Sequence, residues 1–81
     1  MPTAAVPLTE LPPGALARFE EARLDPEAIR LLRALGLVES CEFRLCQSGE
    51  PYIVQVRATR IGLSRAVARS LLVVPSAPGA D

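Results

Sequence analysis

The sequence contains no histidine, no lysine and no tryptophan, and its aromatic residues are one tyrosine and two phenylalanines. Enzymes that use an activated nucleophile or a general base draw heavily on histidine and lysine, and no serine or cysteine here stands in a recognisable nucleophile motif. A glycine-rich phosphate-binding loop is missing as well. We therefore expect a protein that is not an enzyme and that binds no cofactor.

Groups that could hold a metal ion are also scarce. Without histidine, the candidates are two cysteines and carboxylates scattered along the chain, with no spacing typical of a metal site. If Cys41 and Cys46 lie in one strand, they are roughly 17 Å apart on opposite faces, which is too far for a disulfide. We predict no metal site and two reduced cysteines. The sequence leaves open whether either cysteine responds to oxidation.

Long apolar runs are absent too. None approaches the roughly 20 residues that cross a bilayer, and residues 1–10 lack the basic start and apolar stretch of a secretion signal. These features predict a cytoplasmic protein that does not insert into a membrane.

The 81 residues suffice for one small domain, and apolar residues make up 49% of them. A domain of this size buries only roughly 60% of the surface that its unfolded chain exposes, so we expect a modest core and no deep pocket. Both ends of the chain are rich in proline, alanine, serine and glycine. We predict loose tails at residues 1–7 and 76–81 around one domain at residues 8–75.

The nine basic residues are all arginine and balance nine acidic residues, which argues against a general affinity for nucleic acid. Their distribution is uneven, because residues 51–75 contain four arginines and no acidic residue. These are Arg57, Arg60, Arg65 and Arg69. Either they form a solvated face that keeps the domain soluble, or they bind an acidic surface of a protein partner. Nucleic acid is disfavoured further because Tyr52 is the only aromatic residue nearby.

The segment LDPEAIRLLRALG carries the clearest local signal and predicts a helix. Asp25 is suited to cap its first amides, Pro26 to occupy its first position, and Gly36 to end it. The apolar residues recur at helical spacing and predict a wide stripe that covers the core. The stripe consists of Ala28, Ile29, Leu31, Leu32 and Leu35.

Around this helix the apolar residues alternate with a period of two, which is typical of strands. We expect strands at residues 15–21, 41–47, 51–58, 60–63 and 71–74, and one helical turn after Ser64. Ala17 and Phe19 are expected to face inward. Five strands this short predict a mostly β fold that curls into a small barrel, because closure hides the edges of a sheet.

The turn at Ser48-Gly49-Glu50 joins two of these strands as a hairpin. Either Tyr52 or Ile53 must face outward if the other faces the core. With Pro51, the outward residue would form a small apolar spot at the hairpin tip. We predict a contact surface for a protein partner, apolar at this tip and basic along the return of the hairpin.

Several short motifs occur in a characteristic order. They are Leu8 and Leu11-Pro12-Pro13-Gly14, Leu32-Arg33-Ala34-Leu35-Gly36-Leu37, Gly49-Glu50-Pro51 with Ile53 and Val56, Ile61-Gly62-Leu63, and Ala68. This order resembles the FeoA family of bacterial ferrous iron transport, and through it the SH3-like domain at the C-terminus of some iron-dependent repressors. The resemblance covers about residues 8–74.

The resemblance implies an SH3-like β-barrel that acts as an adaptor in ferrous iron uptake. Such proteins are thought to contact the cytoplasmic G domain of the membrane transporter FeoB or to help assemble it. The alternative implied by the same resemblance is a protein- or peptide-binding module associated with an iron-dependent transcriptional regulator. A monomer and a weak homo-oligomer are both compatible with the sequence.

The chain departs from the family pattern at four positions. Glu39 and Ser40 stand where the family usually has a Pro-Gly pair, Ala58 replaces a glycine, and Ser64 replaces an arginine. These departures concern the partner surface rather than the fold, and the sequence leaves open whether that surface is kept.

Overall fold

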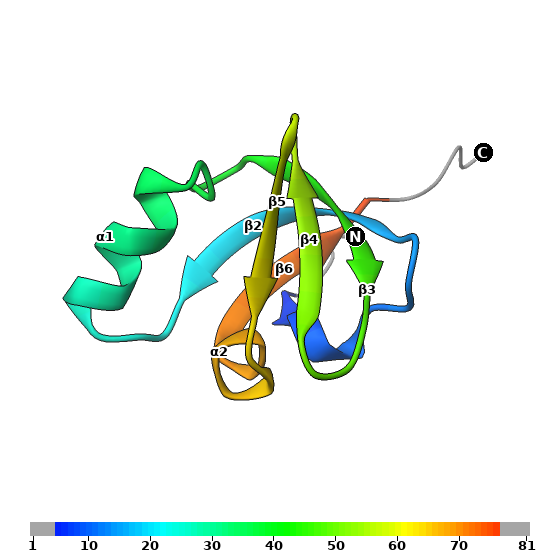
Figure 1. Cartoon of the computed structure of the whole chain (residues 1–81), viewed down its shortest axis with the longest axis horizontal. Coiled ribbons are helices and arrows are strands. Elements are labelled where there is room, and N and C mark those ends of the chain that lie inside the picture. The colour runs from blue at the N-terminus through cyan, green and yellow to red at the C-terminus, as the bar shows by residue number, and fades with distance from the viewer. Residues whose placement is uncertain (1–4, 77–81) are drawn as a thin grey trace.

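The computed structural model describes residues 5–76, so the parts of the predicted tails at residues 1–4 and 77–81 lie outside the described chain. Figure 1 shows a strongly curved sheet with one helix projecting at its side and a second helix at one end. The elements are β1 (Val6–Pro7), the 3-10 helix η1 (Leu8–Glu10), β2 (Leu16–Ala22), α1 (Pro26–Ala34), β3 (Glu42–Gln47), β4 (Tyr52–Val56), β5 (Thr59–Leu63), α2 (Arg65–Arg69) and β6 (Leu71–Pro75). The predicted mostly β class is confirmed.

The strands form one antiparallel sheet in the order β1-β6-β2-β3-β4-β5. Strands β1 and β5 are therefore its two edges, and within residues 5–76 they do not pair with each other. The sheet curls as predicted but does not close into a barrel. Helix α2 packs against η1 and β6 at one end of the curl.

The structure has six strands instead of the five expected. The additional strand is β1, in which Val6 pairs with Val73 and Pro7 with Leu72. Two residues are too few to show an alternating pattern, and proline is tolerated there because β1 is an edge strand. Residues 6 and 7, which the sequence assigned to the loose N-terminal tail, are thus held by the sheet.

Helix α1 begins and ends where the sequence predicts. The Asp25 side chain accepts a hydrogen bond from the Ala28 backbone nitrogen at 3.0 Å, and Pro26 occupies the first helical position. Gly36 follows the helix with a φ of +106°, a conformation that favours glycine. The capping residues were therefore sufficient to predict where α1 begins and ends.

The prediction that the whole apolar stripe of α1 covers the core is wrong. Leu32 is the buried residue of this helix, whereas Leu31 is 64% exposed and Leu35 is 42% exposed. The helix lies beside the end of the sheet instead of across its face (Figure 1), so only one line of its side chains reaches the interior.

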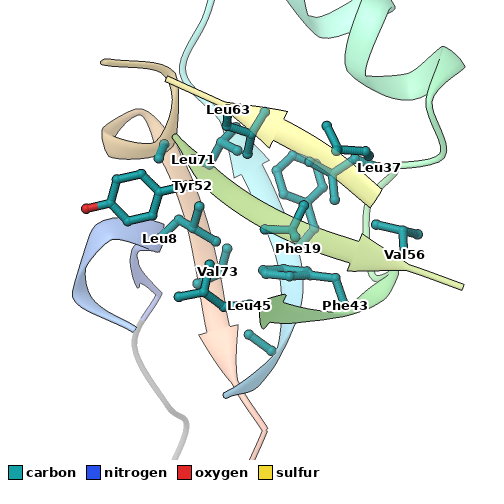
Figure 2. Packing of buried hydrophobic residues seen from close by; sticks show 14 of the residues in the cluster. Leu8, Phe19, Leu37, Phe43, Leu45, Tyr52, Val56, Leu63, Leu71 and Val73 are labelled. Atoms are coloured by element: carbon teal, nitrogen blue, oxygen red, sulfur yellow. The ribbon is translucent and has the colours of Figure 1, made fainter. Parts of the chain in front are cut away.

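The core is built by the inward side chains of the strands, as the period of two predicts. Ala17 and Phe19 are buried on β2, and Phe43 and Leu45 on β3. Figure 2 shows the two phenylalanine rings pointing into the interior from neighbouring strands. The other buried apolar residues are Leu8, Leu11, Leu32, Leu37, Tyr52, Val54, Val56, Ile61, Leu63, Ala68, Leu71 and Val73.

Candidate partner-binding surface

The predicted apolar tip of the hairpin lies at the β3–β4 turn. Pro51 is exposed, Ile53 is half-buried on the outer face of β4, and Tyr52 is only 6% exposed. Figure 2 shows the Tyr52 ring beside Leu8 in the core. Tyr52 therefore belongs to the core, which corrects its place among the predicted contact residues and leaves Pro51 and Ile53 at the surface.

The same turn is tied to the start of α2. A Glu50 carboxylate oxygen accepts a hydrogen bond from the Arg65 backbone nitrogen at 3.2 Å and lies 3.8 Å from Arg65 Nε. The Ser64 hydroxyl accepts a second bond from the Val67 nitrogen, also at 3.2 Å. Two of the free amides at the start of α2 are thus satisfied, and Arg65 is held beside the hairpin tip.

The four predicted arginines do not form one patch. Arg65 and Arg69 lie on α2, near the β3–β4 turn, whereas Arg57 lies in the β4–β5 turn at the opposite end of β4 (Figure 1). Four residue steps along β4 separate the two ends by roughly 13 Å. Arg60 lies on β5 closer to Arg57. The predicted basic return of the hairpin is therefore two separate pairs of arginines.

Strand register adds a residue that sequence reasoning missed. Arg44 on β3 is opposite Gln55 on β4, and Gln55 is opposite Arg60 on β5, so the three side chains form a row on the outer face of the sheet. Arg60 Nε donates to Gln55 Oε1 at 3.2 Å, and Gln55 Nε2 donates to the Arg57 carbonyl at 3.0 Å. The alternation of β3 already points Arg44 outward, but only the pairing places it near Arg60.

A second feature missed from the sequence is an apolar surface on and after α1. The large apolar residues exposed in the described chain are Leu31, Leu35 and Val38. Leu35 and Val38, with Arg57 and Thr59, line a groove of about 570 Å³ between the end of α1 and the β4–β5 turn. The sequence did offer a signal for this apolar surface. Five residues of the nine-residue helix are apolar, which is more than a helix beside a small sheet can bury, because such a helix buries only a narrow stripe.

Other sites for ligands are small or shallow. A cavity of about 110 Å³ lies between α1 and β2, and its lining includes Phe19, Ile29 and Leu37. Cys41 and Cys46 are both half-buried free thiols. Among residues 5–76, no three histidine, cysteine or acidic side chains gather where they could hold a metal ion. No helix in that range is long and apolar enough to cross a membrane.

The fold and surface define a small SH3-like β protein. The family model for the FeoA domain matches residues 6–75, and the chain belongs to the FeoA family. Membership places it among the small accessory proteins of ferrous iron transport. No curated protein matches the chain significantly.

Solved structures agree with this assignment. FeoA of Stenotrophomonas maltophilia, a prokaryotic SH3 domain protein solved in complex with zinc, is 37% identical with a TM-score of 0.68, over 82% of this chain and 86% of that one. FeoA of Chlorobium tepidum is 25% identical with a TM-score of 0.82, over 86% of this chain and 70% of that one. IdeR of T. acidophilum shares the fold at 22% identity and a TM-score of 0.82, over 94% of this chain and 36% of that one.

Proposed function

We propose that the protein acts in the cytoplasm as a non-enzymatic adaptor of ferrous iron uptake, and that its partner is the cytoplasmic side of the transporter FeoB. The FeoA family match over residues 6–75 carries this proposal. An adaptor needs exposed surface that a partner can cover, and this chain offers exposed apolar and basic side chains close together near the β4–β5 turn.

The proposed contact surface includes Pro51 and Ile53 at the hairpin tip and Arg57, Arg60, Arg65 and Arg69 around β5 and α2. All six have side chains that are exposed or half-buried. Arginine is suited to such a surface because its planar guanidinium donates several hydrogen bonds to carboxylates. We expect the partner surface to be acidic where it meets these residues.

The test is affinity purification of the tagged protein from cytoplasm and membranes of the native bacterium, with and without ferrous iron. The wild-type protein should retain FeoB. The double variant Arg60→Glu, Arg65→Glu should lose most of it, whereas Arg30→Glu, Arg33→Glu makes the same charge change on α1 and should retain it. If FeoB is never retained, or is retained equally by both double variants, the proposal fails.

A second candidate function follows from the fold shared with IdeR and with manganese-dependent transcriptional repressors. In this alternative, the chain binds a protein or peptide segment of an iron-dependent transcriptional regulator. The purification above separates the two functions, because recovery of a regulator in place of FeoB from the soluble fraction would favour the second.

A further inference from the structure

Strand β5 ends the sheet and, among the strands of residues 5–76, pairs only with β4. The pairs run from Tyr52 opposite Leu63 to Val56 opposite Thr59. An edge strand presents one row of backbone amides and carbonyls that no neighbouring strand uses, and such a row is a template for another extended segment. The side of β5 that faces away from β4 is therefore a possible binding edge.

The hairpin geometry identifies the backbone groups on this edge. A two-residue turn makes Val56 and Thr59 a hydrogen-bonded pair, and bonded and non-bonded pairs alternate from there. Arg60 and Gly62 consequently direct their backbone N–H and C=O groups away from β4. Within residues 5–76, neither residue takes part in any other backbone hydrogen bond outside the ladders.

The outer face of the sheet is open at Gly62, where an added Cβ atom would meet no atom within 4 Å. At the Thr59 end, the edge runs into the groove of about 570 Å³ that Leu35 and Val38 line. An extended segment beside β5 would thus find backbone partners along the strand and an apolar surface at one end of it.

The charge around the edge selects among possible segments. Arg60 stands on the edge strand itself and Arg57 in the turn before it, and neither β4 nor β5 carries an acidic residue. Among residues 5–76, the Arg60 guanidinium makes one hydrogen bond, to Gln55, and is otherwise available to an incoming carboxylate. Arg57 lines the groove with Glu42, whose carboxylate accepts a hydrogen bond from the Ser76 hydroxyl.

We infer that the free edge of β5 binds an extended acidic segment of a partner protein by strand addition. The segment pairs with the backbone of Arg60 and Gly62, places a carboxylate at Arg60, and packs an apolar side chain against Leu35 and Val38. This inference deepens the adaptor role proposed above, because it assigns that role a binding edge and a partner chemistry.

The test uses the full-length protein and a short fluorescent peptide that alternates glutamate and valine, with a matched peptide that carries lysine in place of glutamate. Fluorescence anisotropy should show binding of the glutamate peptide alone. Gly62→Pro removes a donor from the free edge without touching the pairing to β4 and should weaken binding about tenfold. Arg60→Glu should weaken it by about the same factor.

Arg30→Glu, the same charge change on α1, is the matched control and should keep wild-type affinity. Amide exchange of Arg60 and Gly62 should slow when the glutamate peptide is bound. Equal affinity of the wild type, Gly62→Pro and Arg60→Glu for this peptide, or no binding at all, would overturn the inference. If Gly62→Pro does not fold, the inference is tested by the affinities of Arg60→Glu and Arg30→Glu for the glutamate peptide. Equal affinities of these two variants would then overturn it.

A second copy of the chain is the competing occupant. A concentration-dependent dimer in sedimentation, abolished by Gly62→Pro and unaffected by the glutamate peptide, would assign the edge to self-pairing and overturn the inference. The peptide assay needs no transporter, so the two proposals can fail separately. A negative peptide assay does not contradict binding to FeoB, and a failure to retain FeoB does not contradict strand addition at β5.

Discussion

Leu45 is one of the best-buried side chains of the protein, with 0% exposure on β3. Its backbone also joins two segments, because its nitrogen donates to the Ala15 carbonyl at 2.9 Å and its carbonyl accepts from Gly14. Leu45→Ala keeps the backbone bonds but leaves a cavity, so we expect a loss of about 2–5 kcal/mol in the free energy of unfolding. Urea denaturation measures it.

The matched control for that substitution is Leu31→Ala. Leu31 is 64% exposed, so the same change in side chain should alter the free energy of unfolding by no more than about 0.5 kcal/mol. Equal losses at the two positions would contradict the burial that the structure assigns to them.

Arg57 occupies the β4–β5 turn with a φ of +57°, a left-handed conformation that costs an L-residue roughly 1 kcal/mol or more. Glycine adopts it freely, although glycine also gains entropy in the unfolded chain. Arg57→Gly should therefore raise the free energy of unfolding by roughly 0.5 kcal/mol, as thermal denaturation would show.

Ala58 provides the comparison for Arg57, since the family usually has a glycine at this position. Its φ is not positive in this structure, so Ala58→Gly gains no relief of strain and should lower the free energy of unfolding by roughly 0.5 kcal/mol. If Ala58→Gly stabilised the protein and Arg57→Gly destabilised it, the left-handed residue of the turn would be Ala58 and not Arg57.

Helix α2 is a five-residue element, too short to be stable by itself in water. Its start is held by Ser64 and Glu50, and Ala68 packs into the core. The β3–β4 turn thus positions α2 through one carboxylate, and with it the two arginines that α2 displays. Substitution of Glu50 should therefore alter the positions of Arg65 and Arg69.

We expect Glu50→Ala to lower the free energy of unfolding by about 0.5–1 kcal/mol, because the Arg65 amide loses its acceptor and a weak ion pair is lost. Arg65→Ala keeps the backbone amide and removes only the exposed ion pair, so its effect should be smaller. Chemical shifts of residues 64–69 should change more in Glu50→Ala than in Arg65→Ala. The reverse order would mean that the side-chain pair, not the amide bond, holds α2.

The whole molecule relies on apolar packing and backbone pairing more than on charge. Within residues 5–76 no charged or polar residue is buried, and the two ion pairs found there are exposed. Charge is instead displayed at the surface, and the charged residues that segment 51–75 contributes to it are all arginines. Salt should consequently affect what the protein binds more than how stably it folds.

Raising sodium chloride from low concentration to about 1 M should therefore shift the free energy of unfolding by less than about 0.5 kcal/mol through charge screening. Binding of the glutamate peptide should weaken over the same range, since its carboxylate meets an exposed arginine. Calorimetry and anisotropy at matched salt concentrations measure the two effects. Strong salt dependence of stability, with salt-independent binding, would contradict this division.

The sequence by itself determined the elements whose signals are local. Asp25, Pro26 and Gly36 mark the limits of α1 because capping depends only on adjacent backbone groups. Alternation on β2 identified the inward side chains of Ala17 and Phe19, because successive strand residues point to opposite faces. These features pointed to the mostly β class, and the ordered motifs led to the FeoA family.

Tertiary structure alone decided how those elements meet. Pairing across the sheet put Arg44 beside Gln55 and Arg60, left β5 as an edge, and turned Tyr52 rather than Ile53 into the core. The position of α1 beside the sheet left Leu35 exposed. Each of these depends on contacts between residues far apart in the chain, which the local preferences of one segment do not encode.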